Sequence, residues 1–263
     1  MAGFNGFQFV FDGVPSNYYG LSLAEFDPNG FKTNSAGSNV KLIEDGLPRR
    51  VKPYFYGVVQ NEKLQFEISI TNTKGLDRRS VAVIQKWLFG QTKYKKLQIV
   101  QCDMDDMYFN CMLINPQLIT VGNVPYGFTC TVECDAPWGW EFPRTSNIVT
   151  QSVETNLQFY NSSDDSDYLY PVINFKLDIN TTDISVINLD DNNRTSSFTN
   201  LSPSETIYID NDLEIITSST GLNRLKNFNG KYFRFKQGLN RIRITGGLTT
   251  ASVTYQFARK VGS

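Results

Sequence analysis

The sequence predicts a mainly β protein of two domains, with one helix in the first domain. Three observations support this prediction: short runs of alternating apolar and polar residues recur, turn residues separate them, and the chain holds 19 Phe and 13 Tyr. Alternation with a period of two places one face of a strand against a core, and aromatic residues fit pleated, half-buried surfaces. A length of 263 residues favours two domains of ordinary size.

The first domain is predicted to open with a strand over residues 7–11, in which Phe7, Phe9 and Phe11 alternate with other residues. This strand ends at Asp12-Gly13, a strong turn pair. Residues 27–50 are rich in Gly, Asn, Ser and Pro and have no periodic pattern, so they predict a long excursion. A loop of this length is usually functional or ordered by a partner.

One helix is predicted, directly after a strand over residues 64–70. Asp77 can cap a helix of about twelve residues, with Val81, Ile84 and Leu88 on one face and Gly90 as its end. Apolar residues at this spacing form a stripe that packs on a sheet.

Further strands are predicted up to a domain boundary near residues 145–150. They cover residues 96–100, 107–114 and 128–134. Prolines at 137 and 143 and a polar run over 145–156 then indicate the boundary, which gives domains of residues 1–147 and 148–263.

The second domain is predicted to be an antiparallel β-sandwich, because about seven short strands follow one another at short spacing. The predicted strands are residues 172–177, 183–189, 206–210, 213–217, 231–235, 241–245 and 252–257.

Histidine is absent from the chain. It is the commonest general base and a frequent metal ligand, so its absence removes Ser-His-Asp and Cys-His nucleophile systems and His-based zinc sites. No glycine-rich phosphate-binding loop occurs either. The sequence therefore predicts a non-enzymatic protein without catalytic, cofactor-binding or metal-binding residues. The enzymatic alternative is a glycosidase that uses two carboxylates.

Charge and hydropathy restrict the partners. The 25 basic and 26 acidic residues give a net charge of −1, so no basic surplus favours binding to nucleic acid. The basic cluster at residues 93–96 is interpreted as a solvated strand edge. No run of about 18 apolar residues predicts a membrane span. The N-terminus lacks a signal-peptide pattern, so we expect the protein to be made and kept in a cytoplasm until it is assembled.

Acidic and cysteine clusters are interpreted as structural. Three acidic clusters are predicted to be solvated turns, because Asp bonds its own backbone, with a catalytic or calcium role as the alternative. The four cysteines lack Cys-x-x-Cys spacing and are predicted to be small buried hydrophobes, with a metal site or a disulfide as the alternative. These residues are Asp103, Asp105 and Asp106; Asp164, Asp165 and Asp167; Asp190 and Asp191; and Cys102, Cys111, Cys130 and Cys134.

Several weak motifs occur in a characteristic order. The first half contains Phe9-Val10-Phe11-Asp12-Gly13, Tyr19-Gly20-Leu21, residues 64–68, Trp87-Leu88-Phe89, residues 97–111 and residues 128–138; the second half contains Tyr170-Pro171 and residues 184–188, 205–210 and 238–242. Their order and spacing resemble the distal tail proteins, or baseplate hub proteins, of siphovirus-type bacteriophages. The resemblance covers nearly the whole chain.

This resemblance implies a structural virion protein at the tip of a phage tail. Members form hexameric rings in which a tail-tube-like N-terminal domain connects the tail tube to the tail-associated tip protein, and DNA passes through without specific binding. A galectin-like C-terminal sandwich projects outward and often anchors receptor-binding proteins. For this chain we expect the excursion over residues 27–50 to contact another subunit or ring.

Two further readings remain open. The second half could be a carbohydrate-binding module or lectin-like adhesin, although it has neither Trp nor His, and the residues that galectins use for galactosides are largely missing. A tail-tube or tube-terminator protein is the other alternative, but such proteins usually lack a second sandwich.

Overall fold

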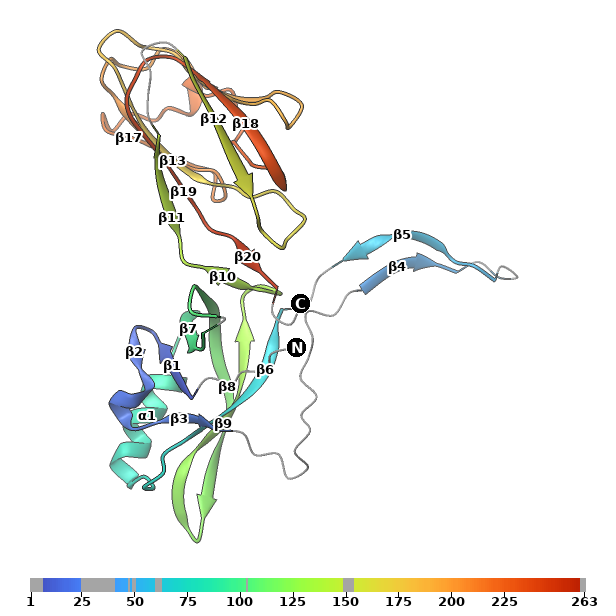
Figure 1. The fold of residues 1–263 in the computed structure, drawn as a ribbon, viewed down its shortest axis with the longest axis vertical. Coiled ribbons are helices and arrows are strands. Elements are labelled where there is room, and N and C mark those ends of the chain that lie inside the picture. Colours follow the sequence, from blue (N-terminus) through green and yellow to red (C-terminus); the bar gives the residue numbers. More distant parts are fainter. Residues whose placement is uncertain are drawn as a thin grey trace. The chain divides into compact units, whose positions relative to one another are not determined.

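The computed structural model describes residues 7–24, 41–46, 48, 51–59, 63–102, 104–148 and 154–260. The chain divides into two compact units, residues 1–141 with 259–263 and residues 142–258. Antiparallel sheets dominate both units (Figure 1), which confirms the predicted mainly β fold. None of the helices in the described ranges is long and apolar enough to cross a membrane.

The first unit contains a nine-stranded sheet with the main order β2-β1-β7-β8-β9-β6-β3. Off this path, β10 pairs with β8, and β20, whose Arg259 belongs to this unit, pairs with β10. The strands are β1 (Gln8–Phe11), β2 (Val14–Pro15), β3 (Ser22–Ala24), β6 (Gln65–Thr71), β7 (Lys95–Val100), β8 (Met107–Val121), β9 (Val124–Cys134), β10 (Gly139–Glu141) and β20 (Ala258–Arg259).

The turn after β1 and the α-helix described in this unit agree with the sequence. Asp12 and Gly13 both have positive φ, 51° and 78°, as a tight hairpin turn requires. The helix α1 (Arg78–Phe89) begins where the Asp77 side chain accepts a hydrogen bond of 2.7 Å from the Ser80 amide. A 3-10 turn, η1 (Ser16–Tyr19), follows β2.

Helix α1 packs its apolar stripe on one face of this sheet. Ile84 and Leu88 are buried in the core of the unit, as predicted. Trp87 lies parallel to Phe9, with ring centroids 6.0 Å apart, and donates a hydrogen bond to the Phe11 carbonyl. The helix therefore covers the face to which the aromatic side chains of β1 point.

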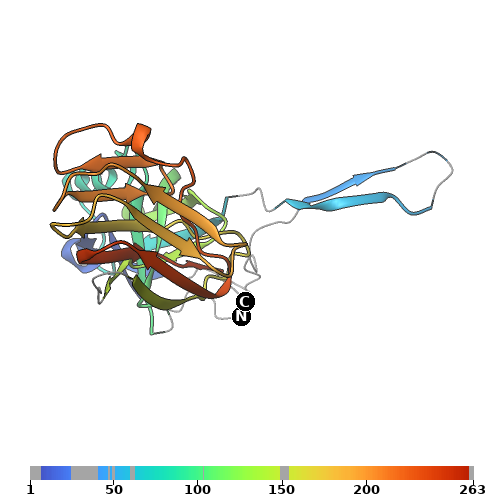
Figure 2. The same cartoon turned by 90° about the horizontal axis from the view of Figure 1, so that it is seen from above.

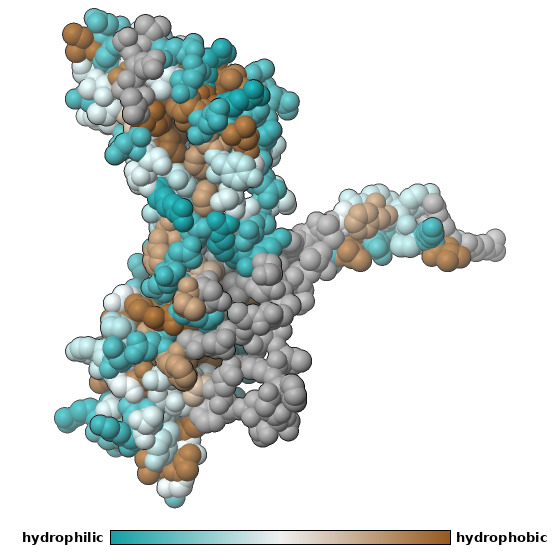
Figure 3. All heavy atoms as spheres, viewed as in Figure 1, coloured by the Kyte–Doolittle hydropathy of each residue, from teal (hydrophilic) through white to brown (hydrophobic). Residues whose placement is uncertain are grey.

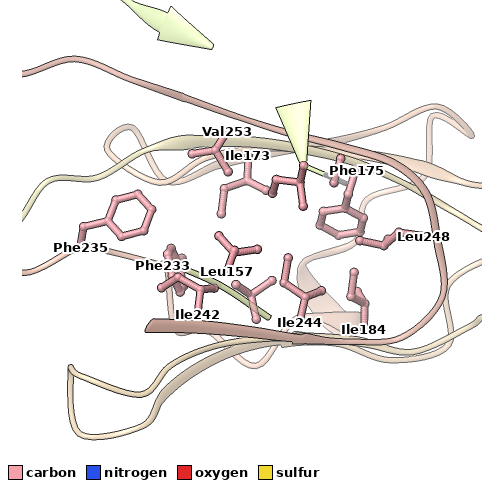
Figure 4. A pocket seen from close by; sticks show the side chains of 13 residues that line it. Leu157, Ile173, Phe175, Ile184, Phe233, Phe235, Ile242, Ile244, Leu248 and Val253 are labelled. Atoms are coloured by element: carbon pink, nitrogen blue, oxygen red, sulfur yellow. The ribbon is translucent and has the colours of Figure 1, made fainter. Parts of the chain in front are cut away.

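The second unit is the predicted sandwich of two antiparallel sheets, β11-β19-β13-β16-β17 and β12-β18-β14-β15. Their strands are β11 (Arg144–Ile148), β12 (Glu154–Asn161), β13 (Val172–Leu177), β14 (Ile184–Asn188), β15 (Arg194–Phe198), β16 (Thr206–Asp210), β17 (Ile215–Ser218), β18 (Gly238–Thr245) and β19 (Leu248–Tyr255), with a 3-10 turn η2 (Leu225–Asn227). The core between the sheets leaves an apolar cavity of about 20 Å³, lined by side chains such as Ile173, Leu157 and Val253 (Figure 4).

The strand predicted over residues 231–235 is wrong. Phe233 and Phe235 are buried in alternation, which produced the strand-like pattern. The Phe233 amide, however, donates to the side-chain oxygen of Asn211 at 2.7 Å, and only Phe235 forms an isolated bridge, to Leu169. A side-chain amide thus replaces the neighbouring strand that the pattern implied.

Candidate assembly surfaces

A separate two-stranded sheet is formed by β4 (Lys41–Asp45) and β5 (Tyr54–Val59). These strands pair only with each other within the described ranges (Figure 1, Figure 2). The aperiodic excursion predicted over residues 27–50 therefore needs correction at 41–45, while residues 27–40 lie outside the described residues. The second strand was missed, although Pro53 followed by Tyr, Phe, Tyr, Gly, Val and Val is a β-prone run.

This hairpin exposes large apolar side chains (Figure 3). Phe55 and Tyr56 are 60% and 66% exposed, and Leu42 and Ile43 of the paired strand are exposed as well. An isolated two-stranded hairpin is marginally stable in water, and grouped exposed apolar residues mark interaction sites. The hairpin has the composition of an element that a second polypeptide covers.

On two strands of the nine-stranded sheet, β6 and β9, the face opposite the core is polar. On β6 and β9, buried Ile68, Ile70, Cys130 and Val132 alternate with polar residues of the other face. Those polar residues include Glu67, Ser69, Thr129, Thr131 and Glu133. The Ser69 and Thr129 hydroxyls lie 3.4 Å apart across the strands. On these two strands the open face thus presents hydroxyls and carboxylates, whereas on β8 the apolar Met112 and Ile114 lie on the same side, opposite Glu133 and Thr131.

The basic cluster at residues 93–96 does not form a free positive patch. The Lys95 ammonium donates to Asp12 at 2.7 Å. The Lys96 ammonium lies 4.4 Å from the centroid of the Tyr108 ring. Because β7 pairs with both β1 and β8, Lys95 and Lys96 do not lie at a sheet edge, which corrects the interpretation as a solvated strand edge.

The hairpin between β8 and β9 ends in an apolar tip. β8 runs to Val121, well beyond the residue 114 predicted from the sequence. Gly122 and Asn123 have φ of 56° and 68° and form the turn. Leu118, Val121 and Val124 are exposed around it. The tip is a second apolar surface on the first unit.

Buried carboxylates are paired with arginines. Among the described residues, three carboxylates are buried: Glu141, Asp191 and Glu205. Each accepts a hydrogen bond from an arginine: Glu141 from Arg259 Nε at 2.6 Å, Asp191 from Arg234 Nε at 2.8 Å, and Glu205 from Arg224 Nη2 at 2.6 Å. For Glu205, the hydrogen bonds from Arg224 and Ser218 outweigh burial and lower the pKa to about 2, whereas a glycosidase needs one carboxyl group held protonated. These three pairs tie strands and loops together.

The acidic clusters predicted as turns occupy different surroundings. Asp105 and Asp106 lie exposed in a turn, and Asp103 lies outside the described residues. Asp190 and Asp191 are corrections to the solvated interpretation. Asp191 is buried and paired with Arg234. The Asp190 carboxylate binds the Arg241 guanidinium at 2.8 and 3.0 Å, and hydrogen bonds from Arg241 lower the pKa of Asp190 to about 2. Asp164, Asp165 and Asp167 lie in a bend, where Asp165 accepts from the Asp167 amide.

Three of the four cysteines are buried, as predicted, and Cys102 is exposed, which corrects the prediction for that residue. All four are free thiols. Cys111 and Cys134 face each other across β8 and β9. Burial raises the pKa of Cys130 and Cys134 to about 12, so both remain protonated.

Known proteins share this architecture. Residues 4–136 match a family model described as the phage tail protein N-terminal domain, and residues 138–255 match a phage tail C-terminal domain. The fold and the family match define a phage tail protein. The chain belongs to this phage tail protein family.

Solved structures show a similar fold over nearly the whole length of the chain. The Dit protein (gp 19.1) of phage SPP1, described as a paradigm of hub adsorption apparatus in phages that infect Gram-positive bacteria, aligns with a TM-score of 0.70 and 12% identity. The alignment covers 95% of this chain and 98% of that chain. A chain of the phage P2 baseplate in its activated conformation with Ca aligns with a TM-score of 0.52 and 11% identity, over 97% and 99%. A search of curated proteins finds no match.

Proposed function

We propose that this chain is the hub subunit at the distal end of a phage tail. In this role, six copies form a ring that joins the tail tube to the tail-tip proteins and serves as a platform for receptor-binding proteins. The role is structural and not enzymatic. The observation that carries the proposal is the fold shared with SPP1 Dit over 95% of this chain, within a phage tail family.

The β4–β5 hairpin supports a ring. A cyclic assembly uses a heterologous interface that closes on itself, and each copy must then offer a surface that the next copy covers. The exposed Phe55, Tyr56 and Leu42 provide such a surface. Burial of one large apolar side chain contributes about 1.5–3 kcal/mol, so a few residues repeated around a ring supply a substantial driving force.

The polar face of the nine-stranded sheet supports a channel through which DNA passes without specific binding. Phosphate contacts from Lys and Arg supply most non-specific affinity for DNA. On β6 and β9, Glu67, Glu133 and the hydroxyl residues provide no such cation. The Lys63 ammonium beside them lies 3.8 Å from the Glu133 carboxylate, and Lys96 on β7 lies over the Tyr108 ring. A channel surface of this composition allows DNA to pass without binding it.

The mass of the purified chain in solution tests the ring. We expect native mass spectrometry and light scattering across a concentration series to show about six chains of 29.8 kDa. In the double variant Phe55→Asp, Tyr56→Asp, the ring should dissociate, because two charged carboxylates replace the apolar contact while the exposed positions leave folding intact.

The matched control is Tyr160→Asp, which changes an equally exposed aromatic side chain on β12. This control should keep the wild-type mass. A double variant that still forms rings would refute the role of the hairpin. A wild-type chain that stays monomeric both alone and with its tail-tube protein would refute the ring.

A further inference from the structure

The open face of the β12-β18-β14-β15 sheet has a shallow hollow of about 320 Å³ at one end. The ends of β14, β15 and β18 form it, and its lining combines the hydroxyl residues Ser185, Ser197 and Thr245 with Ile184, Phe198 and Gly246. Residues that alternate with these, such as Ile184 and Phe198, are buried in the core below. The hydroxyl side chains therefore point away from the core.

These three hydroxyl residues form one row across three strands. Ser185 faces Thr245 on one side and Ser197 on the other. The Ser185 and Thr245 hydroxyls are hydrogen bonded to each other. Adjacent strands lie about 4.8 Å apart, which is the spacing of a hydroxyl array that can contact successive oxygen atoms of one small ligand.

A carboxylate and a fourth hydroxyl extend the row by one step along the strands. Asp183 accepts hydrogen bonds from the Asn200 amide at 3.0 Å and from the Thr182 hydroxyl at 3.1 Å, which fix its orientation. An ionised carboxylate has about four acceptor positions, so Asp183 keeps capacity for a ligand. Thr199 lines the hollow opposite Asp183 and is exposed.

The charge of the hollow selects the class of ligand. Among the residues that the structure describes, one carboxylate and no basic side chain line it, so phosphate, sulfate and carboxylate groups are repelled. Hydroxyls both donate and accept hydrogen bonds, and a neutral polyhydroxylated molecule matches this set.

We propose that this hollow binds one neutral sugar unit. The inference goes beyond the hub role and does not depend on it. The second half has no Trp, so no indole ring stacks on the sugar, and we expect weak binding with a Kd of about 1–50 mM. The sequence disfavoured glycan binding because a stacking Trp is missing; the hydroxyl row supplies a different chemistry.

Saturation-transfer difference NMR on the full chain tests the site, since the method suits large assemblies. The probes are glucose, galactose, N-acetylglucosamine and, as an anionic control, inorganic phosphate. We expect saturable transfer to at least one sugar and none to phosphate. In parallel, the Ile184 methyl signal should shift with that sugar, whereas Ile216, in the other sheet, should not.

Two variants locate the binding. Thr199→Val removes a hydroxyl without changing shape and should weaken binding about 3- to 10-fold, and Ser197→Tyr fills the hollow and should abolish it. Thr217→Val, on exposed β17, is the control and should bind as the wild type does. No transfer to any sugar, or equal transfer with Ser197→Tyr, would overturn the proposal. The mass of the same samples shows separately whether the ring forms. A failure of the sugar-binding proposal is therefore distinguishable from a failure of the hub proposal.

Discussion

At the scale of single residues, the Glu205–Arg224 pair is the most buried ion pair described in the second unit. The side chains are 0% and 8% exposed. Arg224 donates from Nε and Nη2 to the two Glu205 oxygens at 2.8 and 2.6 Å, and the Ser202 amide donates at 2.7 Å. Burial alone would raise the pKa of Glu205, but the hydrogen bonds from Arg224 and Ser218 outweigh it and lower the pKa from 4.5 to about 2.

Removal of one partner of this pair should be strongly destabilising. We expect Arg224→Leu to lower the free energy of unfolding by about 3–5 kcal/mol, because it leaves the Glu205 carboxylate buried without its cation. Chemical denaturation measures the change. Arg241→Leu, in a pair whose arginine is 57% exposed, is the matched control and should have a much smaller effect. Equal effects in both variants would contradict this account.

The same pair gives a pH dependence with a defined sign. Because the folded-state pKa of Glu205 is lowered, the ionised pair stabilises the fold fully above the unfolded value, near pH 4.5. That stabilisation should be lost as the pH falls from 4.5 to about 2. In Glu205→Gln, the denaturation midpoint should depend less on pH across this window. An identical pH dependence in the variant would refute the assignment.

The cysteines should differ in their reactivity towards a thiol reagent. Cys102 is exposed, whereas Cys111, Cys130 and Cys134 are buried with raised pKa values. Since the thiolate is the nucleophile, one thiol per chain should react quickly in the folded protein, and the rest only after unfolding. Colorimetric titration with a disulfide reagent measures this, and Cys102→Ser should abolish the fast phase. A second fast thiol in the folded protein would contradict the burial.

At the scale of elements, the second-unit sandwich should accept one more methyl group. Val253 on β19 borders the apolar cavity (Figure 4). We expect Val253→Ile to raise the free energy of unfolding by about 0.8 kcal/mol, the gain from one buried methylene. Val132→Ile, at a fully buried position in the core of the first unit, should instead be destabilising, because a packed core resists added volume. Thermal denaturation distinguishes the two signs.

Elements with strong local signals were predictable from the sequence. Helix α1 could be predicted from three local signals: the cap residue Asp77, the terminal Gly90, and the apolar stripe of Ile84 and Leu88. All three lie within about a dozen residues of one another in the sequence. Edge strands lacked such signals. No strand was predicted for β11 or β12, because only one face of each packs on a core and their sequences are therefore largely polar. At 231–235, the partner of the backbone was the Asn211 side chain, which no periodicity can reveal.

At the scale of the whole molecule, the family was predictable from the order of many weak motifs, but its surfaces were not. Exposure of Phe55 and Tyr56 depends on β4 and β5, which pair only with each other in the part of the chain that the structure describes. A lone run of aromatic residues is equally compatible with a core strand. The hydroxyl hollow joins residues near 185, 197 and 245, which the register of three strands brings together. Long-range pairing therefore decides both surfaces.

The charge of the open sheet face of the first unit provides the last prediction. If this face borders the path of DNA, the double variant Glu67→Lys, Glu133→Lys should retain linear double-stranded DNA in a mobility-shift experiment, and the retention should fall as salt rises, because each new phosphate contact releases counterions. The wild type should retain none. Glu154→Lys with Glu214→Lys makes the same charge change on the second unit and should retain less. Equal retention by both double variants would show that net charge alone determines DNA binding. Tight binding by the wild type would contradict the proposal that DNA passes this face without being bound.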